Sequence, residues 1–321
     1  MLNRRFLRVK ALQELYAYHQ SHESDLSAAE RRLLDDVDSL YELFIYQLSF
    51  WVEVMRFAEQ RIEENKKKNF PTEEDLNPNM KFVNNRVLNV LEQNNHLIRL
   101  EQSYKINWAN DRDDFIRAFY GKLIEYPEYH QYMSNGKDSF DDDKKFLVSI
   151  IDNYLAEDDS LYDFYADRKL AFNSDYQLGV YLLWKFFTEM HSSFGVDSML
   201  PSAYTTENQE NNDDKEFVVE LFRKTILHAE EYRELVQENL SNWDYDRLAL
   251  MDKILIFMAL TEFCYFHSIP VKVTINEYIE ISKFYSTADS RRFVNGMLDK
   301  LSNVLKENGK LVKTGIGLID K

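Results

Sequence analysis

The chain has 321 residues and a net charge of −16, from 39 basic and 55 acidic residues. Its single cysteine, Cys264, excludes a disulfide framework and is typical of a reducing compartment, so we expect a cytoplasmic protein. Glycine and proline are scarce and no long segment alternates as a strand would, which predicts an all-α protein. Neither a signal peptide nor a membrane span is recognisable, and we expect no membrane partner.

The first predicted helix spans about residues 3–19 and carries Arg4, Arg5, Arg8 and Lys10 near its start. Cations in the first turn of a helix oppose its dipole, at a cost of roughly a few tenths of a kcal/mol each. Local helix stability therefore does not explain these residues. A solvated basic N-terminus and a surface that contacts phosphate both remain open.

A second, much longer helix is predicted to end near residue 65. Ser27 and Glu30 have the spacing of a capping box, which places its start there. Apolar residues then repeat at intervals of three and four up to Ile62, which is typical of a bundle or a coiled-coil seam. We favour packing within the chain over coiling between chains. Further amphipathic helices follow, including one over residues 175–191.

Three helices are predicted between residues 246 and 305. The first is apolar on nearly every side, which is typical of a buried helix. Thr274 and Glu277 form a second capping box, which predicts that the next helix begins at Thr274. The third starts near residues 286–290 and contains Gly296. Because glycine there costs about 1 kcal/mol relative to alanine, we expect another backbone to approach it closely.

Several of these segments resemble the NusB family of bacterial antitermination factors. The pairing of V-x-I-N-E at residues 273–277 with F-V-N-G-x-L-D at residues 293–299 is specific to that family. Residues 8–16 are similar to the R-x-x-A-L-Q-x-L-Y pattern of its first helix, and residues 213–221 resemble the acidic opening of a later one. The resemblance implies a NusB-like helical bundle with an additional inserted helical bundle.

The resemblance also implies a domain division. Residues 1–20 and 210–310 would form the NusB-like core, residues 21–209 an acidic helical insertion, and residues 311–321 a C-terminal tail. The charges agree with it, because residues 1–20 carry +3, residues 213–321 carry −3, and residues 21–212 hold the whole −16. The acidity of the chain therefore does not exclude an RNA surface on the core.

The function that the resemblance implies is binding, without catalysis, cofactor or metal. The ligand would be boxA-type leader RNA of ribosomal RNA operons. The protein partners would be NusE, a ribosomal protein, and the transcription elongation complex; no DNA binding is expected. The expected RNA-binding residues are the four N-terminal cations, with Lys283, Arg291 and Arg292 extending the basic surface and Phe293 stacking on a base. Tyr16 and Asp252 would bind the partner. Phe257 stands where the family often has arginine.

Two other classes remain open. NusB-like domains also occur fused to rRNA cytosine methyltransferases, but the chain lacks the glycine-rich cofactor domain of such an enzyme. It could instead be a helical protein-interaction scaffold, with residues 21–212 as its working part and with RNA binding reduced or lost. That segment could dock a basic protein, repel nonspecific RNA, or serve only to keep the chain soluble.

Overall fold

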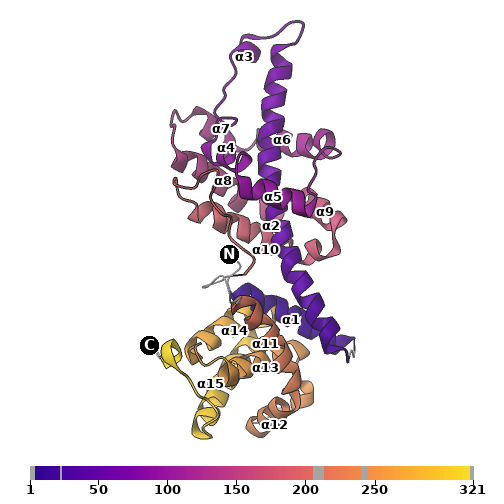
Figure 1. Ribbon diagram of the computed structural model, residues 1–321, viewed down its shortest axis with the longest axis vertical. Coiled ribbons are helices and arrows are strands. Elements are labelled where there is room, and N and C mark those ends of the chain that lie inside the picture. Colours follow the sequence, from indigo (N-terminus) through magenta and orange to yellow (C-terminus); the bar gives the residue numbers. More distant parts are fainter. Residues whose placement is uncertain (1–3, 22–23, 205–212, 241–243, 319–321) are drawn as a thin grey trace. The chain divides into compact units, whose positions relative to one another are not determined.

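Figure 1 shows the computed structural model, which describes residues 4–21, 24–204, 213–240 and 244–318. Within these ranges the regular elements are helices and no strand forms, which confirms the all-α prediction. None of the helices in these ranges is long and apolar enough to cross a membrane. The chain divides into two compact units: unit 1 comprises residues 1–37 and 202–321, and unit 2 comprises residues 38–201.

The first division between the units falls at 37/38, inside the long helix α2 (Leu26–Lys66). The resemblance placed the start of the insertion earlier, at residue 21. Its other expected boundary, 209/210, lies outside the residues that the structure describes. The insertion of residues 21–209 and the tail of residues 311–321 therefore stay predictions.

Unit 1 is a bundle around one buried helix. Helix α13 (Leu250–Tyr265) is buried continuously from Ile254 to Phe263, which confirms the prediction for this apolar segment. Each Leu- or Phe-sized side chain that it buries stabilises the fold by roughly 1.5–3 kcal/mol. The helices that pack against it are α1 (Arg4–Gln20), α11 (Asp213–Leu227), α12 (Ala229–Asn239), α14 (Val271–Tyr285) and α15 (Ala288–Glu307).

Both predicted capping boxes are wrong. Helix α14 begins directly after Pro270, so Thr274 and Glu277 lie inside it, where their side chains contact other helices. Helix α2 begins at Leu26, and Asp25 caps it by accepting a hydrogen bond from the backbone N–H of Ala28 at 3.0 Å. The T-x-x-E and S-x-x-E spacings occur within helices as well as at their starts, so the pattern alone does not locate the first turn.

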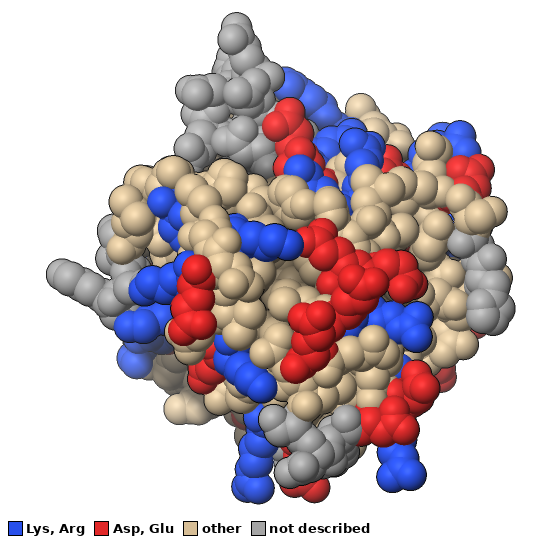
Figure 2. Space-filling view, turned by 90° about the horizontal axis from the view of Figure 1, so that it is seen from below, with Lys and Arg blue, Asp and Glu red and all other residues tan. Residues whose placement is uncertain are grey.

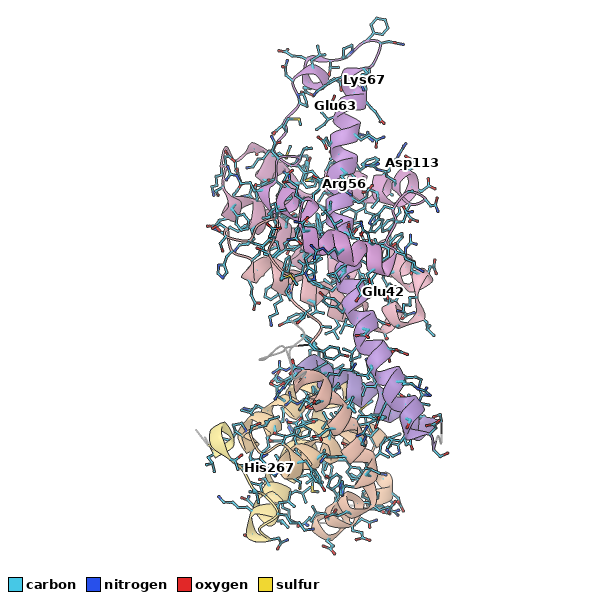
Figure 3. All side chains as sticks on the ribbon, viewed as in Figure 1. Glu42, Arg56, Glu63, Lys67, Asp113 and His267 are labelled. Carbon is cyan, nitrogen blue, oxygen red and sulfur yellow. The ribbon has the colours of Figure 1, made fainter. Side chains whose placement is uncertain are left out.

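Unit 2 is organised around the rest of α2. Between Ser39 and Ala58 nearly every side chain of α2 is buried, which confirms that it packs within the chain. Two exceptions labelled in Figure 3 form ion pairs: Glu42 with Lys169 at 2.7 Å and Arg56 with Glu92 at 2.7 Å. The surrounding helices are α3 (Glu73–Leu76), α4 (Arg86–Glu92), α5 (Asn95–Tyr104), α6 (Arg117–Leu123), α7 (Pro127–Ser134), α8 (Phe140–Asn153), α9 (Asp159–Arg168) and α10 (Leu170–Glu189).

A glycine lets α10 approach α2 closely. A Cβ atom placed on Gly179 would lie 2.9 Å from Cδ2 of Leu43, which is closer than such atoms come. On another side of α2, the indole N–H of Trp108 donates to the Ser49 hydroxyl at 2.9 Å, so this buried polar group is satisfied. The core of unit 2 is therefore specified by small and polar residues as well as by its apolar ones.

Candidate nucleic-acid and partner interface

The start of α1 packs on α11, α13 and α14, and Figure 1 shows these helices side by side. Arg4 donates from Nε to Oδ1 of Asp214 on α11 at 2.9 Å. The guanidinium groups of Arg4 and Arg8 lie 4.9 and 5.2 Å from the ring centre of Phe217. A cation at that distance from an aromatic face is stabilised by roughly 0.5–2 kcal/mol. Helix α11 thus holds two of the expected RNA-binding arginines.

Arg8 is buried rather than presented at the surface. Its side chain is 4% exposed, and it donates to both carboxylate oxygens of Glu262 at 2.5 and 2.8 Å. The same carboxylate accepts hydrogen bonds from the hydroxyls of Tyr278 at 2.7 Å and Thr274 at 3.2 Å. Burial alone would lower the pKa of Arg8, but the charge and hydrogen bonds of Glu262 outweigh it and raise the pKa. Contact between Arg8 and RNA would require this cluster to open.

Arg5 lies at the surface and is also bound to a carboxylate. It donates from Nε and Nη2 to the two oxygens of Glu277 at 2.8 and 2.7 Å, and its side chain is 40% exposed. Glu277 also lies 3.8 Å from Nη1 of Arg8. The structure therefore brings Arg5 and Arg8 together through one carboxylate that the sequence analysis had assigned to a helix cap.

The other expected RNA-binding residues have different surroundings. Lys10 is buried. Lys283 is exposed on α14 and pairs with Glu280. Arg292 on α15 is exposed, 4.0 Å from Asp289. Arg291 is half-buried, with no hydrogen-bond partner for its Nε among the described residues, and Phe293 is also half-buried. The face shown in Figure 2 carries both basic and acidic side chains, with a run of acidic ones across its middle.

The two expected partner-binding residues, Tyr16 and Asp252, differ in their exposure to solvent. Tyr16 is 38% exposed, and its hydroxyl accepts a hydrogen bond from the Gln20 side chain at 3.2 Å. Asp252 is 3% exposed and accepts a hydrogen bond from the Ser286 hydroxyl at 2.5 Å. Because Asp252 lies in the first turn of α13, its negative charge also interacts favourably with the positive end of the helix dipole. In this structure Asp252 joins the start of α13 to the end of α14.

Phe257 and Gly296 were also singled out in the sequence. Phe257, where the family often has arginine, is buried against Tyr232 with ring centres 5.8 Å apart, so it fills the core. A Cβ atom on Gly296 would have nothing within 4 Å, and the residue is exposed. The expectation of a close backbone at Gly296 is therefore wrong.

The ion-pair partners of the arginines were missed by the sequence analysis. Glu262 could have been noticed, because it is a charged residue in the apolar part of α13 that follows the first turn. A buried carboxylate needs a cation or several hydrogen-bond donors. Asp214 and Glu277 give no such signal, because acidic residues in amphipathic helices are common. Their pairing with α1 depends on tertiary contacts.

Unit 2 has an open groove of about 880 Å³ beside the ends of α6 and α8 and the start of α9. The rings of Tyr126 and Tyr154 are stacked there, with centres 3.7 Å apart. Its charged lining residues are Lys122, Glu125, Glu157, Asp158 and Asp159. The described part of the chain holds no cluster of three or more histidine, cysteine or acidic residues that could hold a metal ion.

Comparisons with known proteins agree with this all-helical architecture. The sequence model of the NusB family matches residues 168–303. The transcription antitermination protein NusB of Salinibacter ruber is 43% identical over 105 residues, which is 33% of this chain and 66% of that protein. Its namesake in Chloroherpeton thalassium is 40% identical over 106 residues, 33% and 50% of the two chains. That of Methylacidiphilum infernorum is 38% identical over 122 residues, 38% and 82%.

The fold and these matches define the class as an all-helical bundle protein. The chain belongs to the NusB family. It spans between half and two thirds of the length of the Salinibacter and Chloroherpeton relatives. No solved structure matches it. The family match includes α10 of unit 2 and α11–α14 with most of α15 of unit 1, and it leaves the arginine-bearing helix α1 outside.

Proposed function

We propose that the chain is an RNA-binding transcription antitermination factor. Family membership is the observation that carries this proposal. The segments that gave the resemblance lie in α1, α11, α14 and α15 of the bundle, and the arginine-bearing start of α1 packs on α14. Binding carries the function, and no reaction is involved. A cytoplasmic location fits this role.

The finer proposal is that the RNA is a boxA-type leader of ribosomal RNA operons and that NusE is the partner. Arg4 and Arg5 support it, because both are partly exposed and lie on one helix start. Lys283, Arg291, Arg292 and Phe293 would extend the RNA contact along α14 and α15. Tyr16 is exposed and suits a protein contact.

Fluorescence anisotropy of a labelled boxA leader RNA tests the proposal. The full chain should bind it in preference to an RNA of scrambled sequence, and more tightly when NusE is present. The logarithm of the affinity should fall with the logarithm of the salt concentration by about 0.7 for each phosphate contact to single-stranded RNA. Equal affinity for both RNAs, with and without NusE, would contradict it.

A second candidate function, a helical scaffold with reduced RNA binding, is favoured by one observation. Each of the arginines Arg4, Arg5 and Arg8 already has a carboxylate partner in the folded chain. RNA must compete with these carboxylates, which lowers the gain from each phosphate contact. In the scaffold function the chain would bind NusE or another protein while showing no salt-dependent binding of leader RNA.

For unit 2 we propose docking of a basic protein segment. Residues 38–201 carry a net charge of −11, from 18 basic and 29 acidic residues. The groove beside Tyr126 and Tyr154 combines carboxylates with aromatic faces, and both attract guanidinium and ammonium groups. Its carboxylates are not gathered around one metal-sized point, which suits an extended chain of separate cations.

A further inference from the structure

Two carboxylates bind the exposed arginines at the start of α1. Glu277 occupies the Nε and Nη2 edge of Arg5, and Asp214 occupies Nε of Arg4. We infer that Glu277, together with Asp214, competes with RNA phosphates for these arginines and so restrains binding to RNA of unrelated sequence. This inference rests on the proposed RNA-binding function and assigns to the two carboxylates a restraint on phosphate contact within it.

The geometry of the Arg5 pair supports direct competition. A guanidinium binds a phosphate through the same planar fork of N–H groups that it uses for a carboxylate. In Arg5 that fork is filled by both oxygens of Glu277, at 2.8 and 2.7 Å. Arg5 is 40% exposed, so a phosphate can reach it, but it can use the Nε and Nη2 edge only by exchanging with the carboxylate.

Such exchange lowers the affinity for RNA of any sequence, including unrelated RNA. Affinity for RNA of any sequence comes almost entirely from phosphate contacts, whereas preference for one sequence comes from contacts with bases. When a phosphate replaces a carboxylate on an arginine, the phosphate contact contributes less to the binding free energy than it would at an unpaired cation. Base contacts elsewhere keep their full contribution. The ion pairs therefore lower nonspecific affinity and leave the discrimination between sequences in place.

Glu277 can be changed without dismantling the buried cluster. Its side chain is 19% exposed, and its nearest atom to Arg8 is 3.8 Å away. Arg8 keeps its two hydrogen bonds to Glu262 when the charge of Glu277 is removed. The variant Glu277→Gln therefore removes the charge that pairs with Arg5 while preserving the contact between α1 and α13.

The test compares the full chain with Glu277→Gln and with Glu234→Gln. Glu234 is exposed on α12, so this control removes the same charge elsewhere in unit 1. The probes are polyuridylate and a boxA leader RNA, followed by anisotropy over a series of salt concentrations. For Glu277→Gln we expect polyuridylate to bind about threefold to tenfold tighter at low salt, with a slope steeper by about 0.7. The leader should gain by a similar factor, because it uses the same phosphate contact, so the ratio of the two affinities should stay near that of the parent chain.

Asp214→Asn provides a second, independent variant, because it removes the carboxylate charge that pairs with Arg4. It should shift polyuridylate binding in the same direction, and circular dichroism will show which variants are folded. If both folded variants bind polyuridylate no more tightly than Glu234→Gln, the inference is overturned while the proposed function stands. If neither the parent chain nor any variant binds either RNA, the inference and the proposed function both fail. Binding by Glu277→Gln but not by the parent chain would support the inference.

Discussion

Arg8 and Glu262 are 254 positions apart in sequence and form a buried, two-pronged ion pair at 2.5 and 2.8 Å. The pair ties the first helix of unit 1 to its central helix. Tyr278 and Thr274 on α14 donate to the same carboxylate, so three helices meet at one charged group. A buried ion pair contributes little beyond what apolar residues would, but removing one partner leaves an uncompensated charge in the core.

We therefore expect Arg8→Ala to lower the free energy of unfolding by about 3–5 kcal/mol. Urea denaturation followed by circular dichroism measures this change. Arg292→Ala is the matched control, because Arg292 is exposed and its loss should cost less than about 1 kcal/mol. The double change Arg8→Met with Glu262→Met should cost less than the sum of the single changes. A loss below about 1 kcal/mol for Arg8→Ala would show that the pair is not structural.

Arg4 and Arg5 allow a test of RNA contact that does not disturb the core. In Arg4→Gln with Arg5→Gln we expect weaker binding of leader RNA and a salt slope reduced by about 0.7 for each lost phosphate contact. The helical content should be unchanged, because both side chains are partly exposed. Anisotropy at several salt concentrations provides the measurement. An unchanged slope would remove both arginines from the RNA surface.

The sequence predicted the elements of unit 1 better than the contacts of its charged residues. Helix α13 was predicted because its apolar side chains cover every side, and a segment of that kind has to be buried. The start of α14 was missed because Thr274 and Glu277 fit a capping box, although the preceding Pro270 already marked the true start. The burial of Arg8 could not be predicted, because it depends on which distant carboxylate the fold places beside it.

Tyr16 and Asp252 call for different tests of partner binding. Tyr16→Ala removes an exposed ring, and we expect it to weaken NusE binding by about 1 kcal/mol or more without changing stability. Asp252→Lys would place a cation where Asp252 now accepts a hydrogen bond from Ser286, so it should destabilise the chain. Calorimetric titration with NusE, alongside thermal unfolding, separates the two effects. Unchanged NusE affinity in Tyr16→Ala would take this residue out of the interface.

The reaction rate of the Cys264 thiol reports on the packing at the end of α13. Burial, together with the charge of Glu231, raises the pKa of its thiol. A raised pKa leaves less thiolate at a given pH, so thiol–disulfide exchange at pH 8 should be slower in the folded chain than in urea. Reaction with a chromogenic disulfide measures both rates. Equal rates would mean that the thiol is accessible and that this part of the helix is not packed as described.

The proposed docking of a basic segment in the groove of unit 2 is tested by removing negative charge from the residues that line it. Glu125→Gln with Glu157→Gln removes two groove carboxylates, and Glu73→Gln with Glu74→Gln removes the same charge from the exposed helix α3. We expect the groove variant to bind an arginine-rich peptide about threefold to tenfold more weakly, because each partly exposed ion pair contributes about 0.2–1 kcal/mol. The α3 variant should bind it nearly as the parent chain does. Anisotropy of a labelled peptide at low salt gives the affinities. Equal losses in both variants would mean that the peptide responds only to net charge, and the groove would then have no docking role.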